Sequence, residues 1–204
     1  SCGEGTNSAA TWILDPVTLQ WTRKDPTNGA AGQKPSDYSH SGPSTLAAYD
    51  PNSRLIFVSD DGRRLFSYNY DTNTYALLNG NAGFSFEGSF VVDPNRKLLL
   101  SFGWDYYTNP APRVLAVNIA PGSNYAVQDW SSQVTGCSAI AGVAYPGLAY
   151  DSVQDRIVGW PNLGNSVYTF NPDTKTCSTQ TFTGGPPNSA HRGPDTSNGT
   201  LGRF

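Results

Sequence analysis

The sequence predicts an all-β fold, a β-propeller built from four-stranded antiparallel blades. Short apolar runs rich in Val, Ile, Leu, Tyr and Phe recur along the chain, as pleated, half-buried strands require. One turn recurs six times between such runs, as in YDPNSRLIF (49–57) and VVDPNRKLLL (91–100). The chain contains 21 Gly and 15 Pro, while only 14% of its residues are charged. This composition favours many short strands and turns over helices.

The recurrent turn divides the chain into three complete units of four strands. Its first residues, Asp50, Asp93 and Asp151, stand 43 and 58 residues apart, and a period of about 40–50 residues is typical of a propeller blade. The expected strands are 45–49, 55–59, 65–70 and 75–78 in the first unit; one starting at Ser89, then 97–102, 114–119 and 125–130 in the second; and 147–150, 156–160, 166–170 and 177–182 in the third.

Both ends of the sequence predict partial blades. Residues 11–15 and 20–25 match the last two strands of a unit, CGEG (2–5) stands where a second strand would finish, and GTLGRF (199–204) resembles an opening strand. A closed propeller needs at least about four blades. We therefore expect either part of a longer propeller or two chain ends that combine into one closing blade. The alternative is an antiparallel sandwich of about fourteen strands, which does not need four-stranded units with the turn in register.

These boundaries describe a single propeller domain, or part of one, over residues 1–204. The expected blades are about 1–25 (partial), 45–78, 89–130, 147–182 and 199–204 (the start of a further blade).

Charge and hydropathy exclude some classes of partner. The net charge of −3 and the pI near 5.2 give no electrostatic footprint for nucleic acid. No apolar run approaches the roughly 18 residues of a membrane-spanning helix. The low charge, the many Thr, Ser, Asn and Tyr residues, and a glycosylation sequon at Asn198 favour a secreted, extracellular or cell-surface glycoprotein.

Three cysteines, Cys2, Cys137 and Cys177, allow one disulfide in three ways. We expect a Cys137–Cys177 disulfide in an extracellular chain. The alternative is three reduced, half-buried thiols.

The lengths of the connections indicate which face of the blades carries function. Turns between the first and second strands, and between the third and fourth, are nearly all about four residues long. The other connections vary, and they include 26–44, 79–88, 131–146, 183–198 and the loop GWDYYTNPAPR (103–113). Length variation confined to one face is how a repeat scaffold carries a binding surface.

Aromatic, acidic and amide side chains in these long connections suit sugar recognition, because rings stack on pyranose faces and polar groups bind hydroxyls. Trp104 and Trp160 could instead cap the packing between blades, and for Trp160, at the end of a strand, we favour that role. The expected binding residues are Trp104, Asp105, Tyr106, Tyr107, Asp60, Arg63, Phe86, Glu87, Trp160 and Asn162.

Motifs for catalysis and metal binding are weak. The two histidines, His40 and His191, lie 151 residues apart and no C-x-x-C is present, so we expect no zinc or copper site and no cofactor. No G-x-S-x-G elbow or P-loop occurs. Asp60, Glu87 and Asp105 could meet as a paired-carboxylate glycosidase site, which needs a separation of about 5–9 Å.

Several stretches resemble kelch-type blades. TWILDPVTLQWTR, LFSYNYDTNTYALL and VYTFNPDTKTC look like the second half of such a blade, and AYDPNSRLIFVSDDG and LAYDSVQDRIVGW look like the first half. GTLGRF is similar to a strand of secreted kelch-like proteins of the galactose-oxidase central-domain type. The resemblance covers roughly residues 10–182 and implies a kelch-like propeller. The diglycine that usually closes the second kelch strand is replaced by SDDG, SFGW and VGWP, and the oxidase copper ligands cannot be placed.

These observations lead us to expect a non-catalytic binding or structural module. Its long-loop face would bind a glycan, a protein or a second copy of the chain. The alternative is a carbohydrate-active enzyme, either a galactose-oxidase-like copper oxidase or a glycan hydrolase.

Overall fold

The structure is a computed structural model that describes residues 11–26, 35, 46–60, 63–85, 87–104, 112–161 and 164–184. The chain divides into two compact units, Ser1–Gly83 and Phe84–Phe204. Each unit contains antiparallel sheets whose strands follow one another in chain order.

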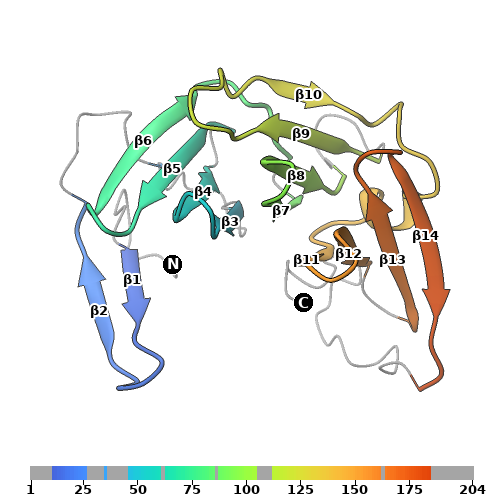
Figure 1. The fold of residues 1–204 in the computed structure, drawn as a ribbon, viewed down its shortest axis with the longest axis horizontal. Helices are drawn as coiled ribbons and strands as arrows, with labels where there is room; N and C mark the ends of the chain where they lie inside the picture. The colour runs from blue at the N-terminus through green and yellow to red at the C-terminus, as the bar shows by residue number, and fades with distance from the viewer. Residues whose placement is uncertain are drawn as a thin grey trace. The chain divides into compact units, whose positions relative to one another are not determined.

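The first unit contains a two-stranded hairpin and one four-stranded sheet (Figure 1). The hairpin pairs β1 (Thr11–Leu14) with β2 (Trp21–Lys24). The sheet, here called blade 1, has the order β3 (Leu46–Asp50), β4 (Leu55–Ser59), β5 (Leu65–Asn69) and β6 (Thr74–Asn79).

The second unit contains two four-stranded sheets and one short helix, α1 (Ser138–Ala141). Blade 2 consists of β7 (Ser89–Asp93), β8 (Leu98–Phe102), β9 (Val114–Asn118) and β10 (Val127–Asp129). Blade 3 consists of β11 (Gly147–Asp151), β12 (Arg156–Trp160), β13 (Ser166–Asn171) and β14 (Thr176–Thr181).

This topology confirms the predicted fold class. Three consecutive four-stranded antiparallel meanders and a preceding hairpin are the blades and partial blade of a β-propeller. Residues 2–5 and 199–204, where two further strands were expected, lie outside the described residues. Strand β10 begins at Val127 rather than at Tyr125, because Tyr125 has a φ of +50° and the Asn124 side chain accepts the N–H of Ala126 in a turn.

Each blade has two faces, because successive side chains of a strand point to opposite sides. We call the face toward later blades in the sequence the forward face, and the opposite one the rear face. In the second unit the rear face of blade 3, with Ile157 and Phe170, packs on the forward face of blade 2, with Leu100 and Phe102. The rings of Phe102 and Phe170 meet edge to face at 5.2 Å between centroids. Blades in this unit are therefore held together by apolar burial between a forward and a rear face.

The recurrent turn has one geometry throughout the described residues. Its first residue is Asp or Asn, whose side-chain oxygen accepts the backbone N–H two residues later. The residue four positions after it has a φ between +54° and +79°. The first residues of these turns are Asp15, Asp50, Asn69, Asp93, Asn118, Asp151 and Asn171. The turn at Asn118 was not among the six in the sequence pattern, because Asn118 is followed by IAPG.

Candidate functional site

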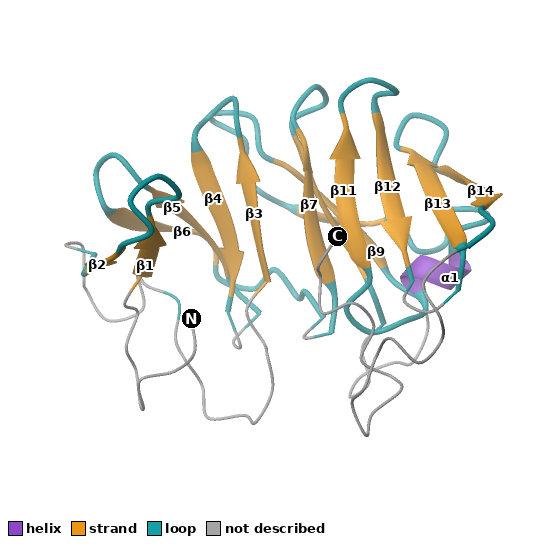
Figure 2. Ribbon diagram, turned by 90° about the horizontal axis from the view of Figure 1, so that it is seen from below, coloured by secondary structure: helices purple, strands orange, loops and turns teal. Residues whose placement is uncertain are grey.

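The long-connection end of the second unit brings three of the predicted binding residues to one segment. This segment, residues 142–146, joins α1 to β11, and we call it the connector. In Figure 2 α1 and the β11–β12 turn lie at opposite ends of blade 3. The predicted residues that contact the connector or the strand after it are Glu87, Trp104 and Trp160.

Backbone hydrogen bonds make these contacts. The N–H of Trp104 donates to the carbonyl of Val143 at 3.3 Å, and the N–H of Tyr145 donates to the carbonyl of Glu87 at 2.6 Å. Trp160 pairs across the sheet with Gly147, the first residue after the connector. The connector therefore fixes the spacing of three chain segments that are distant in sequence.

Gly103, which follows β8, and Gly88, which precedes β7, allow these two parts of the backbone to lie close together. Gly103 has a φ of +135°, and a Cβ placed there would lie 2.6 Å from the Cα of Gly88 and 2.8 Å from the carbonyl oxygen of Glu87. The hydroxyl of Ser85 donates to the carbonyl of Trp104 and accepts the N–H of Glu87 at 3.3 Å. The backbone around Trp104 is thus held by the hydrogen bonds of the Ser85 hydroxyl and by a close approach that glycine at position 103 permits.

The ends of the loop that follows Trp104 are also anchored. The N–H of Gly103 donates to the carbonyl of Arg113, and the N–H of Arg113 donates to the carbonyl of Ala141 in α1. A rigid frame at both ends is the usual setting of a binding loop.

Trp104, Glu87 and Trp160 are each half-buried. The indole N–H of Trp160 donates to the carbonyl of Gly164 at 3.3 Å. Each indole therefore keeps part of its apolar surface accessible, and an accessible indole face is what sugar stacking requires. Five other predicted binding residues lie outside the described residues, namely Asp105, Tyr106, Tyr107, Phe86 and Asn162. The histidines His40 and His191 and the sequon residue Asn198 also lie outside them.

Asp60 and Arg63 belong to the first unit, in the connection between β4 and β5. The Asp60 side chain is fully buried and accepts hydrogen bonds from the backbone N–H of Arg64 at 3.1 Å and from its Nε at 3.0 Å. Arg63 has a φ of +56°, and its carbonyl accepts the N–H groups of Ala82 and Gly83. The structure thus gives both residues contacts that organise this hairpin, and their role in binding stays a prediction.

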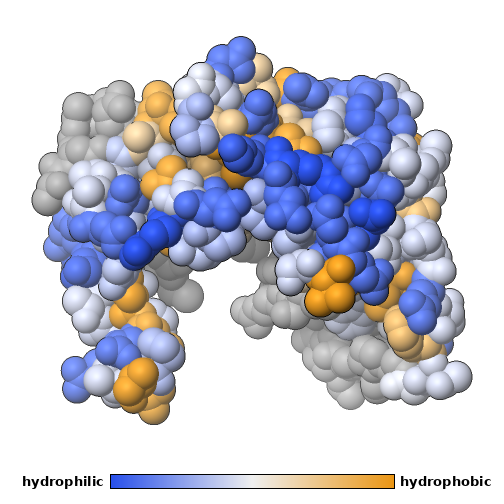
Figure 3. Space-filling view, viewed as in Figure 1, coloured by the Kyte–Doolittle hydropathy of each residue, from blue (hydrophilic) through white to orange (hydrophobic). Residues whose placement is uncertain are grey.

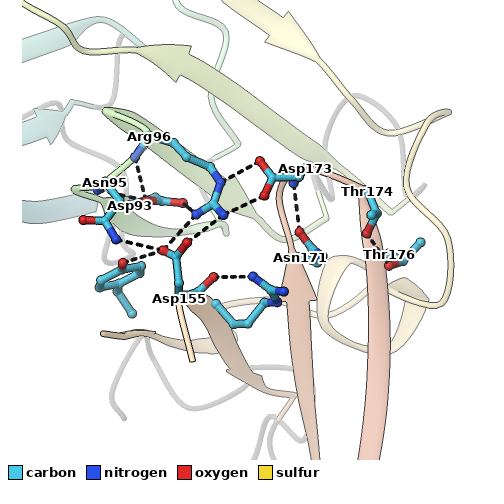
Figure 4. A network of polar contacts seen from close by, with 10 residues as sticks. Asp93, Asn95, Arg96, Asp155, Asn171, Asp173, Thr174 and Thr176 are labelled. Carbon is cyan, nitrogen blue, oxygen red and sulfur yellow. Dashed lines mark hydrogen bonds and ion pairs between the residues drawn. The ribbon is translucent and has the colours of Figure 1, made fainter. Parts of the chain in front are cut away.

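The largest charged network among the described residues joins the β7–β8 turn to the β11–β12 and β13–β14 turns of the second unit (Figure 4). The guanidinium of Arg96 makes two-pronged hydrogen bonds to Asp155, at 2.8 and 2.9 Å, and to Asp173, at 2.7 and 2.8 Å. It also donates to the fully buried carboxylate of Asp93 at 2.8 Å. Arg96 and Asp93 belong to the β7–β8 turn, whereas Asp155 and Asp173 belong to turns of blade 3. The network therefore joins two blades.

The network shifts the pKa values of its members. Hydrogen bonds from Arg96, and then from the Tyr150 hydroxyl, hold the pKa of Asp155 well below its usual value. Hydrogen bonds from Arg96 also lower the pKa of Asp173. Burial, followed by the 2.6 Å hydrogen bond to Asp155, raises the pKa of Tyr150 to about 12. The lowered pKa values keep Asp155 and Asp173 ionised near neutral pH, and the raised pKa keeps the Tyr150 phenol protonated.

Cys137 and Cys177 form the disulfide that the sequence analysis expected. It links the residue before α1 to β14, and the backbone of Thr135 pairs beside it with Lys175 and Cys177.

Across the described ranges no group of three or more His, Cys, Asp or Glu side chains could hold a metal ion. No helix among them is long and apolar enough to cross a membrane.

Comparisons with known proteins yield likenesses of fold only. No family model matches the chain and no curated protein matches it. Among solved structures, virginiamycin B lyase from Staphylococcus aureus is similar over 89% of this chain and 50% of its own, with 11% identity and a TM-score of 0.46.

Two further solved structures are similar, each at 11% identity. The dihydro-heme d1 dehydrogenase NirN has a TM-score of 0.46 over 87% of this chain and 34% of its own. A structural-genomics protein of unknown function from Bacteroides thetaiotaomicron has a TM-score of 0.47 over 82% and 37%. This chain therefore spans half or less of the length of each structure.

Proposed function

We propose that this chain is a secreted or surface-exposed, kelch-like propeller module that binds a glycan at the long-connection end of its second unit. The observation that supports the proposal is that the backbones of Glu87 and Trp104 bond to the connector and that of Trp160 pairs with Gly147, the residue after it. In the sequence, Asp105, Tyr106 and Tyr107 follow Trp104 directly.

The chemistry of these residues suits a neutral sugar. An indole ring can stack on the apolar face of a pyranose, while carboxylate and amide groups bind its hydroxyls. The anchored backbone on both sides of Trp104 lowers the ordering cost of binding, because the frame exists before the ligand arrives.

The extracellular location is supported by the Cys137–Cys177 disulfide, since disulfides persist in oxidising compartments. Its kelch-like character is supported by the four-stranded blades and by the sequence stretches that resemble kelch units.

The test is glycan binding by the wild-type chain and by a Trp104→Ala variant, measured as retention on immobilised polysaccharides and on a glycan array. We expect the wild type to retain at least one neutral glycan, and the variant to bind it at least about tenfold more weakly. The matched control is Tyr49→Ala, which removes an exposed aromatic side chain of the first unit and should leave binding as in the wild type. Circular dichroism and thermal unfolding verify that each variant is folded. Glycan retention that survives in Trp104→Ala, or no retention by the wild type, would overturn the proposal.

A further inference from the structure

The N-terminal hairpin has one face on blade 1 and one face in solvent. The hydroxyl of Thr11 lies 3.1 Å from the hydroxyl of Tyr75, and the side chain of Asn73 donates to the carbonyl of Asp25. The opposite face of the hairpin carries Trp12, Leu14 and Trp21, whose exposed fractions are 43%, 41% and 62%. Figure 3 shows apolar atoms at the surface of this hairpin, at the lower left.

The exposed positions are ones that the complete blades bury. Leu14 pairs with Trp21 directly before the turn residue Asp15, just as Tyr68 pairs with Tyr75 before Asn69 in blade 1. Tyr68 and Tyr75 are only 1% and 9% exposed.

Blade 3 has the same arrangement of a paired, buried residue directly before the turn. Phe170 pairs with Cys177 directly before Asn171, and Phe170 is fully buried. The exposed face of the hairpin is therefore a rear face, and a rear face in the second unit packs on the forward face of another blade.

The chain also has a forward face that is not fully covered. On blade 3, Val158, Trp160 and Val167 are half-buried. Leu100, which occupies the position of Val158 in blade 2, is fully buried beneath blade 3. Beside these residues a shallow polar groove of about 580 Å³ is lined by β12–β14 side chains that include Arg156, Thr169, Ser178 and Gln180.

We propose that the hairpin of one copy of this chain packs, through Trp12, Leu14 and Trp21, on the forward face of blade 3 in a second copy. This contact continues the forward-to-rear packing of blades 2 and 3 and uses two faces that the same chain carries. Val158, Trp160 and Val167 supply the apolar surface, and the guanidinium of Arg156 can lie over an indole ring. Because two different patches meet, the contact is heterologous, so two copies close a ring or several copies form a chain.

Sedimentation velocity of the 204-residue chain over a range of concentrations tests this proposal. We expect the wild type to self-associate and the Trp12→Ser/Trp21→Ser double variant to associate at least about tenfold more weakly. The matched control is Val153→Ser, because Val153 is 92% exposed on the β11–β12 turn, away from both faces. It should associate like the wild type.

A second pair of variants probes the other patch. Ser178 and Thr179 are exposed neighbours on β14 whose side chains point to the forward and the rear side, respectively. Ser178→Arg should weaken association, whereas Thr179→Arg should leave it unchanged. Mixing the hairpin double variant with Ser178→Arg should restore a dimer, because each supplies the patch that the other lacks.

Three outcomes would overturn the proposal. The first is a wild type that stays monomeric and whose tryptophan fluorescence is quenched by a soluble quencher, which would show that the hairpin face remains in solvent. The second is a monomer whose tryptophans are protected, which would show that the chain covers its own hairpin. The third is a mixture of the two variants that stays monomeric although the wild type associates. All of these measurements are made without glycan, so their outcome is separate from that of the glycan test, although Trp160 belongs to both surfaces.

Discussion

Arg96 shows how one side chain can join two blades. Its five donor groups are directed to three carboxylates, two of them on turns of the neighbouring blade. Only arginine presents a planar fork that binds two carboxylates side by side, so lysine could not reproduce the network. Asp93 is fully buried, which makes the positive charge of Arg96 necessary to compensate it.

Replacing Arg96 by Gln should lower the free energy of unfolding by about 2–3 kcal/mol, because a buried carboxylate loses its charged partner. Urea unfolding measures this effect. The matched control is Arg54→Gln, which removes the ion pair with Asp71 that is more than half exposed on both sides. Such a pair is worth less than about 1 kcal/mol. Equal effects of the two substitutions would show that the Arg96 network does not stabilise the fold.

The same network predicts a loss of stability in acid. The pKa values of Asp155 and Asp173 lie below the value of 3.8 expected for an unfolded chain. The unfolded state therefore binds more protons than the folded state below about pH 4, and stability falls as the pH decreases through that range. In Arg96→Gln this dependence should be weaker, which thermal unfolding at several pH values can measure. If the stability of the wild type and of Arg96→Gln changes equally with pH below about pH 4, the network is not the source of the acid sensitivity.

Individual contacts of this kind could not be predicted from the sequence. Arg96 is separated from Asp155 and Asp173 by 59 and 77 residues. Their contact depends on how two blades pack, which strand periodicity does not report. Asp60 was predicted to bind a ligand because it lies in a connection, yet its pairing with Arg64 depends on the turn of that hairpin. The aromatic and acidic composition of the connections indicated Trp104 and Glu87, but not the glycines that hold them together.

At the scale of the element, the recurrent turn explains why the strands could be predicted almost residue by residue. An Asp or Asn side chain caps the turn and a left-handed residue ends it, so the chain reverses after a fixed number of residues. Apolar alternation then marks the strands on either side. Helix α1 has only four residues and was not predicted, because its position depends on tertiary contacts and the Cys137–Cys177 disulfide.

Asp151 offers a direct test of the turn. Its carboxylate accepts the N–H groups of Val153 at 2.8 Å and Gln154 at 3.2 Å. Asp151→Ala should lower the free energy of unfolding by about 1 kcal/mol, as the loss of a comparable helix cap does. Asp151→Asn should retain most of the stability, because Asn69 and Asn171 occupy the same position in other turns. A fully destabilising Asn variant would show that the charge, and not the acceptor oxygen, matters.

A substitution at Gly103 tests whether the candidate site depends on the close packing of the backbone around Trp104. Alanine there would place a Cβ within 2.8 Å of the backbone of Gly88 and Glu87, in a conformation that residues with side chains rarely adopt. Gly103→Ala should lower stability by about 2–4 kcal/mol. If the variant remains folded, its glycan retention should be reduced. Gly80→Ala is the control, because nothing lies within 4 Å of the added methyl group. Chemical denaturation of both variants decides the question.

At the scale of the whole molecule, the chain divides into two compact units. We therefore expect a disulfide within one unit to stabilise that unit and not the other. The Cys137–Cys177 disulfide lies entirely within the second unit and closes a segment with a sequence separation of 40 residues. Closing a loop of that size contributes about 3–4 kcal/mol through the entropy of the unfolded chain. The Cys137→Ser/Cys177→Ser double variant should therefore destabilise blades 2 and 3 by an amount of this order.

Hydrogen exchange measured by mass spectrometry can resolve the effect by strand, because amide protection reports local as well as global opening. We expect the strands β7–β9 and β11–β13 to exchange faster in the double variant, while β4 and β5 of blade 1 keep their protection. Cys2 remains in both proteins, so a reducing agent is kept in the variant sample to prevent new disulfides. Equal loss of protection in both units would show that the chain unfolds as one cooperative body, in which blade packing across the whole molecule outweighs the internal stability of each unit.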